Sequence, residues 1–161
     1  MKRMKELGIN VCLPGYSGMV PHDAKERLCL DVADPGKWND YKRPAFLQPT
    51  SKRFAEIASI YYKEQQRLYG KADFYSMDPF HEGANTEGID VPSAYKKIAK
   101  AMLDANSEGK WVIQFWQWRG AQYNVLSQVE QGKLIVLDLF SDAHTHFGSY
   151  QGHDAVYCML A

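Results

Sequence analysis

The sequence predicts an α/β fold, namely an incomplete (β/α)8 TIM-type barrel of about five parallel strands with intervening helices. Three observations support this prediction. Four of the five strand-like segments are nearly continuous apolar runs, which is typical of parallel strands buried on both faces. Segments with helical periodicity lie between them, so strands and helices alternate. Carboxylates follow several of the strand segments, and no glycine-rich nucleotide-binding motif follows the first strand segment. Both observations favour a barrel over an open doubly wound sheet.

The strand-like segments are short and are bounded by turn residues. In chain order they are residues 9–13, 74–80, 111–118, 134–140 and 155–160. The predicted helices run from a cap at Thr50 or Ser51 to Tyr69, from Pro92 to about residue 103, and over residues 122–131. Residues 31–46 show no period, and we expect them to form a long surface loop of the kind that carries binding residues.

The composition is that of an ordinary globular protein, with 45% hydrophobic and 24% charged residues. Lysine plus arginine equal aspartate plus glutamate at 19 each, so charge predicts no nucleic acid and no membrane as a partner. No apolar segment is long enough to cross a bilayer, and we expect no secretory signal peptide within these residues. The three cysteines lack metal-ligand spacing, and Cys12 and Cys158 are predicted to be buried thiols.

Residues 73–83 (DFYSMDPFHEG) are the most informative stretch of the chain, because an apolar strand there leads to Glu82 and a glycine turn. The carboxyl ends of barrel strands are where such enzymes place an acid or a base. Packing against Phe80 would raise the pKa of the Glu82 carboxyl and keep it protonated near neutral pH, as a general acid requires. Glu82 is therefore a candidate acid for glycoside hydrolysis, although a glutamate in this place can also be a solvated loop residue.

Two neighbours of Glu82 are candidates for substrate binding. Asp78 lies four residues earlier, which on a continuous strand would place both carboxylates on one face. Asp78 could bind sugar hydroxyls from inside the barrel, or it could be a buried polar group satisfied by a neighbouring strand. His81 could orient Glu82 or bind a substrate hydroxyl, or it could simply pack or bond the backbone.

Two later strands supply further candidates. Trp116, near the end of its strand, could stack on a sugar ring, whereas Trp111 is predicted to be a packing residue. Asp138 lies within an otherwise apolar run, where an unpaired carboxylate is costly to bury, so it needs a partner or a function. Asp142, just past the same strand, is predicted to be a loop carboxylate.

Several segments together resemble the α-N-acetylglucosaminidases of glycoside hydrolase family 89. They occur in the family's order and at roughly its spacing, and they extend over nearly the whole chain. The segments are residues 11–21 (VCLPGYSGMVP), 75–83 (YSMDPFHEG), 111–118 (WVIQFWQW), 134–141 (LIVLDLFS) and 157–160 (YCML). A set of such segments is far more specific than any one of them.

The resemblance implies a barrel that hydrolyses terminal, non-reducing α-linked N-acetylglucosamine with retention and uses no metal or organic cofactor. It implies that Glu82 is the acid/base and that Trp116 lines the sugar pocket. His81 departs from the family pattern, since other members have asparagine there. The family's nucleophile is a glutamate beyond the segment that ends at Leu160. We therefore expect residues 1–161 to be a fragment of the catalytic domain, truncated at both ends and without useful turnover alone.

Two other functions fit the residues less closely. The chain could belong to a different barrel glycosidase with Asp138 or Asp142 as its second carboxylate, which substrate preference among aryl glycosides would distinguish. It could also be a non-catalytic carbohydrate-binding fragment, in which case Glu82→Gln should leave sugar binding unchanged. The partner that the family resemblance implies is a glycan ending in N-acetylglucosamine.

Overall fold

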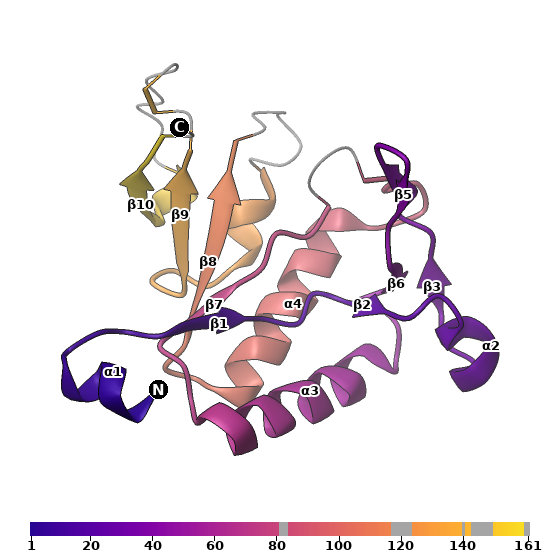
Figure 1. The fold of residues 1–161 in the computed structure, drawn as a ribbon. Coiled ribbons are helices and arrows are strands. Elements are labelled where there is room, and N and C mark those ends of the chain that lie inside the picture. Colours follow the sequence, from indigo (N-terminus) through magenta and orange to yellow (C-terminus); the bar gives the residue numbers. More distant parts are fainter. Residues whose placement is uncertain (81–83, 117–123, 140, 143–149, 160–161) are drawn as a thin grey trace.

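A five-stranded parallel β-sheet forms the centre of the molecule (Figure 1). The computed structural model describes residues 1–80, 84–116, 124–139, 141–142 and 150–159. In spatial order, which is also chain order, the strands are β1 (Cys12–Pro14), β7 (Phe74–Ser76), β8 (Lys110–Phe115), β9 (Leu134–Asp138) and β10 (Asp154–Tyr157). All neighbouring pairs are parallel, and each strand lies next to the one before it in the chain, as in the wall of a barrel.

Two long helices, α3 (Phe54–Tyr69) and α4 (Val91–Ala105), cover one face of the sheet (Figure 1). Their aromatic side chains meet those of the strands. Tyr62 of α3 contacts Tyr75 of β7 edge-on, with ring centroids 5.5 Å apart. Tyr95 of α4 stacks on Trp111 of β8 at a centroid distance of 5.4 Å. The hydrophobic core therefore lies between the sheet and these helices.

Helix α4 begins and packs as its sequence predicts. The Asp90 side chain accepts the backbone N–H of Ser93 at 3.2 Å, and Pro92 occupies the first turn. The Ser93 hydroxyl also donates to Asp90 Oδ2 at 2.7 Å, and this bond, followed by the backbone one, holds the pKa of the Asp90 carboxyl below its usual value. One apolar face then repeats at the helical spacing and is buried through Tyr95, Ile98, Ala99 and Met102.

Strand β8 buries only one of its two faces within the described residues. Trp111, Ile113 and Phe115 are buried against the helices, whereas Val112 and Gln114 on the other face are half-buried. The continuous apolar run had predicted burial on both faces. The half-buried face is the one that would point into the interior of a barrel.

Residues 31–46 are not the irregular surface loop that the sequence predicted. They and their neighbours form β3 (Val32–Ala33), a hairpin of β4 (Lys37–Trp38) and β5 (Tyr41–Lys42), and β6 (Ala45–Leu47). Strand β6 pairs antiparallel with β2 (Met19–Val20) on one side and with β3 on the other. All of β6 is buried. Strands of two or three residues are too short to show an alternation, which is why no period was visible.

The remaining elements are short. They are α1 (Lys2–Glu6), α2 (Ala24–Leu28), and the 3-10 turns η1 (Leu126–Gln128) and η2 (Tyr150–Gly152). The third predicted helix, over residues 122–131, is confirmed in part, since residues 124–125 are α-helical and continue into η1, although the helical structure ends at Gln128. Leu126 and Val129 are buried as expected. None of the helices in the described ranges has the length and apolar character needed to cross a membrane.

The predicted burial of the cysteines is also wrong. Cys12 and Cys29 are exposed, and Cys158 is partly exposed. Cys12 lies on β1, an edge strand of the sheet, and Cys158 directly follows β10, the other edge strand. Side chains at an edge have a neighbouring strand on one side only, so an apolar run there does not guarantee burial.

Candidate functional site

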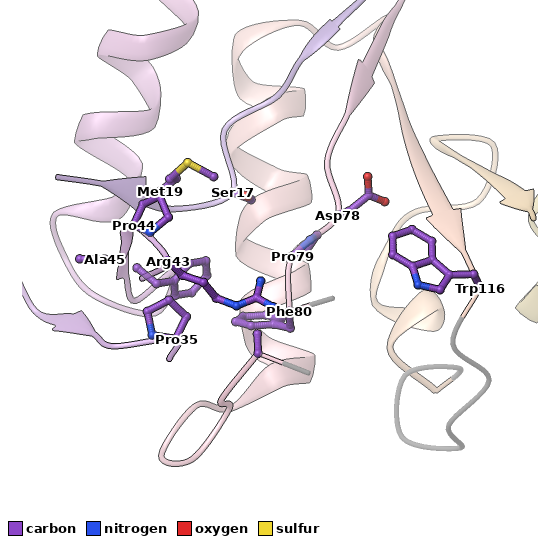
Figure 2. A pocket seen from close by; sticks show the side chains of 12 residues that line it. Ser17, Met19, Pro35, Arg43, Pro44, Ala45, Asp78, Pro79, Phe80 and Trp116 are labelled. Carbon is purple, nitrogen blue, oxygen red and sulfur yellow. The ribbon is translucent and has the colours of Figure 1, made fainter. Parts of the chain in front are cut away.

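A cavity of about 300 Å³ opens beyond the carboxyl ends of the central strands (Figure 2). Segments that follow β1, β7 and β8 all contribute to it, and this is the end at which barrel folds place their sites. We call residues 77–80 with Trp116 the sheet wall, and residues 17–19 with 35–46 the loop wall. The lining residues are Ser17, Met19, Pro35, Arg43, Pro44, Ala45, Phe46, Asp78, Pro79, Phe80, Ala84 and Trp116.

The backbone of the sheet wall is held by two stacked aromatic residues. The indole Nε1–H of Trp111 donates to the Met77 carbonyl at 2.7 Å. The Tyr95 hydroxyl donates to the Pro79 carbonyl at 3.3 Å. Burial, and then the charge of Asp78, raises the pKa of Tyr95, so this phenol remains a hydrogen-bond donor. Met77 and Pro79, two residues apart in the sheet wall, are therefore anchored from β8 and from α4.

Asp78 is the acidic side chain among the described residues that line the cavity. Its Oδ1 accepts the backbone N–H of Gln114 at 2.7 Å, which ties the end of β7 to β8. Burial raises the pKa of the Asp78 carboxyl from 3.8 to about 6, and the hydrogen bond from Gln114 opposes that rise only in part. A carboxyl with this pKa is present in both protonation states near neutral pH, so it can accept or donate a hydrogen bond to a ligand.

Phe80 links the two walls. Its ring meets that of Phe46 edge-on at a centroid distance of 4.9 Å, and it lies 6.2 Å from that of Tyr95. Its φ of 65° places a bulky residue in the left-handed region, which costs about 1–2 kcal/mol. Such strain persists only where surrounding contacts impose it and is common at functional sites. The aromatic contacts on both sides of Phe80 supply that constraint.

The loop wall is fixed where β2 meets β6. The Leu47 N–H donates to the Gly18 carbonyl at 2.7 Å. Gly18 has φ of 120°, and a Cβ there would lie 2.7 Å from the Leu47 oxygen, so this position requires glycine. The contact holds Ser17 and Met19 beside β6. Among the described lining residues, Arg43 supplies the only cationic side chain.

The structure brings two of the sequence-predicted residues together. Asp78 and Trp116 both line the cavity, and Figure 2 shows the Trp116 ring extending from the end of β8 toward Asp78. Trp111 is fully buried, as the packing prediction required. The reasoning for Asp78 was wrong in one respect, since β7 ends at Ser76 and no continuous strand joins Asp78 to the residues beyond Phe80. Predicted site residues His81 and Glu82 lie outside the described residues.

Asp138 lies away from the cavity. It is fully buried, and its register partner on β8 is Phe115, so it shares the helix-covered face of the sheet. Its Oδ2 accepts the hydroxyl of Tyr150 at 2.5 Å, which supplies the partner that a buried carboxylate needs. Asp142 is exposed, as predicted for a loop carboxylate.

The sequence predicted that residues 31–46 would carry binding residues, but it singled out no individual residue of the loop wall. Ser17, Met19, Arg43 and Phe46 were not candidates, because each lies in a strand or turn too short to be recognised by period. A usable signal was present at residues 44–49 (PAFLQP), where prolines flank a buried apolar triplet.

The arrangement suits a cyclic, polyhydroxylated ligand. Phe80, Phe46 and Trp116 offer apolar faces, while Asp78 and Arg43 offer polar atoms that can bind hydroxyl groups. Within the described ranges, no group of three or more His, Cys, Asp or Glu side chains could hold a metal ion. The described lining residues can recognise such a ligand by stacking and hydrogen bonding.

Known proteins with similar sequences agree with this description. Residues 1–161 match the family model described as "Alpha-N-acetylglucosaminidase (NAGLU) tim-barrel domain". Human alpha-N-acetylglucosaminidase is 29% identical over 179 residues, and the match covers 99% of this chain. It covers 24% of the human protein, so the chain spans about a quarter of that relative's length.

Solved structures agree as well. A family 89 glycoside hydrolase from Clostridium perfringens, in complex with its substrate GlcNAc-alpha-1,4-galactose, superimposes with a TM-score of 0.91 at 33% identity, covering 98% of this chain and 19% of that one. The family 89 enzyme from the same organism in complex with 2-acetamido-1,2-dideoxynojirimycin gives a TM-score of 0.82 at 36% identity, covering 88% and 17%. These matches confirm the predicted fold class, an incomplete (β/α)8 barrel.

Proposed function

The chain belongs to the α-N-acetylglucosaminidase (NAGLU) TIM-barrel domain family, and on this premise we propose that its protein is a glycoside hydrolase. The reaction is hydrolysis of terminal, non-reducing α-linked N-acetylglucosamine from a glycan, with retention of configuration. The partner is therefore a glycan ending in that sugar. Support comes from the human relative and from the Clostridium perfringens enzyme bound to GlcNAc-alpha-1,4-galactose.

One observation carries the proposal at the level of residues. The sheet wall places Asp78, Phe80 and Trp116 around a cavity at the carboxyl ends of the strands, directly before Glu82 in the sequence. The carboxyl ends of the strands are where a barrel glycosidase needs its acid. Glu82 is the proposed acid/base, which protonates the leaving oxygen and later activates water.

The remaining roles follow from what each side chain offers. Trp116 stacks on the apolar face of the sugar, and Asp78 binds a sugar hydroxyl through the carboxyl oxygen not engaged by Gln114. His81, next to Glu82 in the sequence, binds a second hydroxyl. Asp138 accepts a hydrogen bond from Tyr150 on the helix-covered face of the sheet, away from the cavity. Its predicted role in substrate binding therefore has no support in this geometry.

A retaining reaction also needs a second carboxylate, about 5–5.5 Å from the first, as the nucleophile. Asp138 is fully buried and bonded to Tyr150, which argues against that role. We therefore propose that residues 1–161 form part of a longer catalytic domain whose other segments supply the nucleophile. The isolated chain should then bind sugar poorly and should have no useful turnover.

The experiment is hydrolysis of an aryl α-N-acetylglucosaminide by the full-length protein and by its Glu82→Ala variant. We expect the variant to be slower by about 10²- to 10⁴-fold, since general acid–base catalysis contributes that much. Added azide should restore turnover, because it can attack the glycosyl-enzyme without a general base. Glu87→Ala, which removes an exposed carboxylate from the following loop, is the matched control. A Glu82→Ala protein as fast as the wild type would contradict the proposal.

A further inference from the structure

The β4–β5 hairpin presents two exposed aromatic rings beside the cavity. Trp38 and Tyr41 are direct partners across the two strands. Trp38 is 49% exposed and Tyr41 is 74% exposed. Lys37 and Lys42, their neighbours on the hairpin, are also exposed. Contiguous exposed aromatic surface rimmed by polar groups is uncommon and marks places where a ligand or a protein binds.

The base of the hairpin is part of the loop wall. Pro35 and Arg43, which flank the two strands, both line the cavity. The Arg43 N–H donates to the Gly36 carbonyl at 3.1 Å and closes the hairpin. The Asn85 N–H donates to the Pro35 carbonyl at 3.1 Å, which ties this base to the loop after β7. The hairpin is thus anchored to the cavity through its backbone.

The length of the strands places the rings within reach of a bound oligosaccharide. Trp38 is three residues from Pro35, and Tyr41 is two residues from Arg43. At the rise of an extended chain these separations are at most roughly 7–10 Å, or about one to two sugar rings. Figure 1 shows the hairpin at the same end of the molecule as the arrowheads of β8 and β9.

The chemistry of the hairpin favours sugars as the occupant. Flat aromatic rings can stack on the apolar faces of pyranoses, and the lysine ammonium groups can donate hydrogen bonds to hydroxyls. The cavity volume of about 300 Å³ is enough for a single sugar ring, and Phe46 and Pro35 continue its apolar lining toward the hairpin. A glycan whose terminal sugar ring enters the cavity therefore has its following rings next to Trp38 and Tyr41.

We propose that Trp38 and Tyr41 bind the sugars on the leaving-group side of the bond that is cleaved. This inference rests on the proposed function, because it needs a glycan whose terminal ring occupies the cavity. The hairpin then selects for oligosaccharides over simple glycosides. Its contribution is to binding and not to the bond-breaking step.

The test compares two substrates in the full-length protein and in its Trp38→Ala/Tyr41→Ala variant. One substrate is an aryl α-N-acetylglucosaminide, and the other is a tetrasaccharide with a terminal α-linked N-acetylglucosamine. We expect the ratio of the tetrasaccharide kcat/KM to the aryl kcat/KM to fall about tenfold in the variant, mainly through KM. Tyr69→Ala removes a similarly exposed aromatic ring, 55% exposed, at the end of α3, and should leave the ratio unchanged.

Two outcomes would overturn the inference. Equal losses on both substrates would mean that the hairpin supports the cavity itself, and no loss on either would mean that other parts of the protein cover the rings. A wild-type protein that hydrolyses neither substrate would contradict the proposed function. Calorimetric titration with the same tetrasaccharide would then decide the inference separately, because tenfold weaker binding by the variant supports it and equal binding overturns it.

Discussion

The two walls of the cavity are built in opposite ways. Each residue of the sheet wall from Met77 to Phe80 is anchored by a hydrogen bond or an aromatic contact from another element. The loop wall is held at its base, by the contact at Gly18 and by the hydrogen bond from Asn85 to Pro35, and it then extends into a hairpin whose four strand residues are all exposed. The difference fits the proposed roles, in which the sheet wall holds the sugar at the cleaved bond and the loop wall binds the sugars that follow it.

The largest expected contrast is between two tryptophans, one behind the sheet wall and one in the loop wall. Trp111→Ala removes a fully buried ring and the donor to the Met77 carbonyl, so we expect it to destabilise the protein by about 3–5 kcal/mol. Trp38→Ala removes a half-exposed ring and should stay within about 0.5 kcal/mol of the wild type. Urea denaturation followed by circular dichroism would measure both. Similar costs would show that the two walls are equally integrated into the fold.

The next contrast concerns the pH dependence of stability. The folded-state pKa of Asp78 lies above its unfolded value, so its protonation stabilises the folded protein. That stabilisation is fully present below about pH 4 and is lost as pH rises through about 6. Asp78→Asn stays uncharged and keeps an acceptor for the Gln114 N–H. We expect this variant to be more stable than the wild type by about 1–3 kcal/mol at pH 7.5, with no difference near pH 4.

Thermal unfolding of both proteins across this pH range would measure the effect. A constant difference at all pH values would contradict the titration of Asp78. We also expect the stabilised variant to have a higher KM for the aryl substrate, because its side chain can no longer accept at both oxygens. A gain in stability at the expense of substrate binding is common for groups in ligand sites.

A smaller effect is expected from one hydroxyl group behind the sheet wall. Tyr95→Phe keeps the ring stack on Trp111 but removes the hydrogen bond to the Pro79 carbonyl, at a cost of about 1 kcal/mol. Because that carbonyl precedes Phe80, we also expect kcat to fall about three- to tenfold. Tyr61→Phe removes a matched hydrogen bond to the carbonyl of Pro14 and serves as the control. Equal kcat values for the two variants would show that the Tyr95 bond has no positioning role.

The difference between the sheet wall and the loop wall also explains how much of the fold and of the site could be predicted from the sequence. The strand around Trp111 and the helix around Tyr95 are long enough to be recognised from an apolar run and from periodicity. Strand β7 has only three residues, but it was recognised because the apolar run continues past its end. Trp116 was identified because it lies near the end of such a strand, and Asp78 because it lies four residues before Glu82. Strand ends were placed too late, since Pro79 and the left-handed Phe80 terminate β7 by local geometry that a hydrophobic run does not reveal.

The loop wall was not predictable for a physical reason. Its strands have two or three residues, and they are stabilised by contacts with residues far away in the sequence, such as the one from Leu47 to Gly18. Tertiary contacts of this kind leave no local period. For Asp138 the burial was predicted from the apolar run around it. Its partner Tyr150 and the face that it occupies were not predictable, because they depend on the register between β8 and β9.

The most direct test of the two-wall account is the affinity of the full-length protein for free N-acetylglucosamine, measured by calorimetry. A single ring should occupy the sheet wall, so we expect Trp116→Ala to weaken binding at least ten times more than Trp38→Ala does. The account would be contradicted if Trp38→Ala weakened binding as much as Trp116→Ala, or if Trp116→Ala bound the sugar as tightly as the wild type.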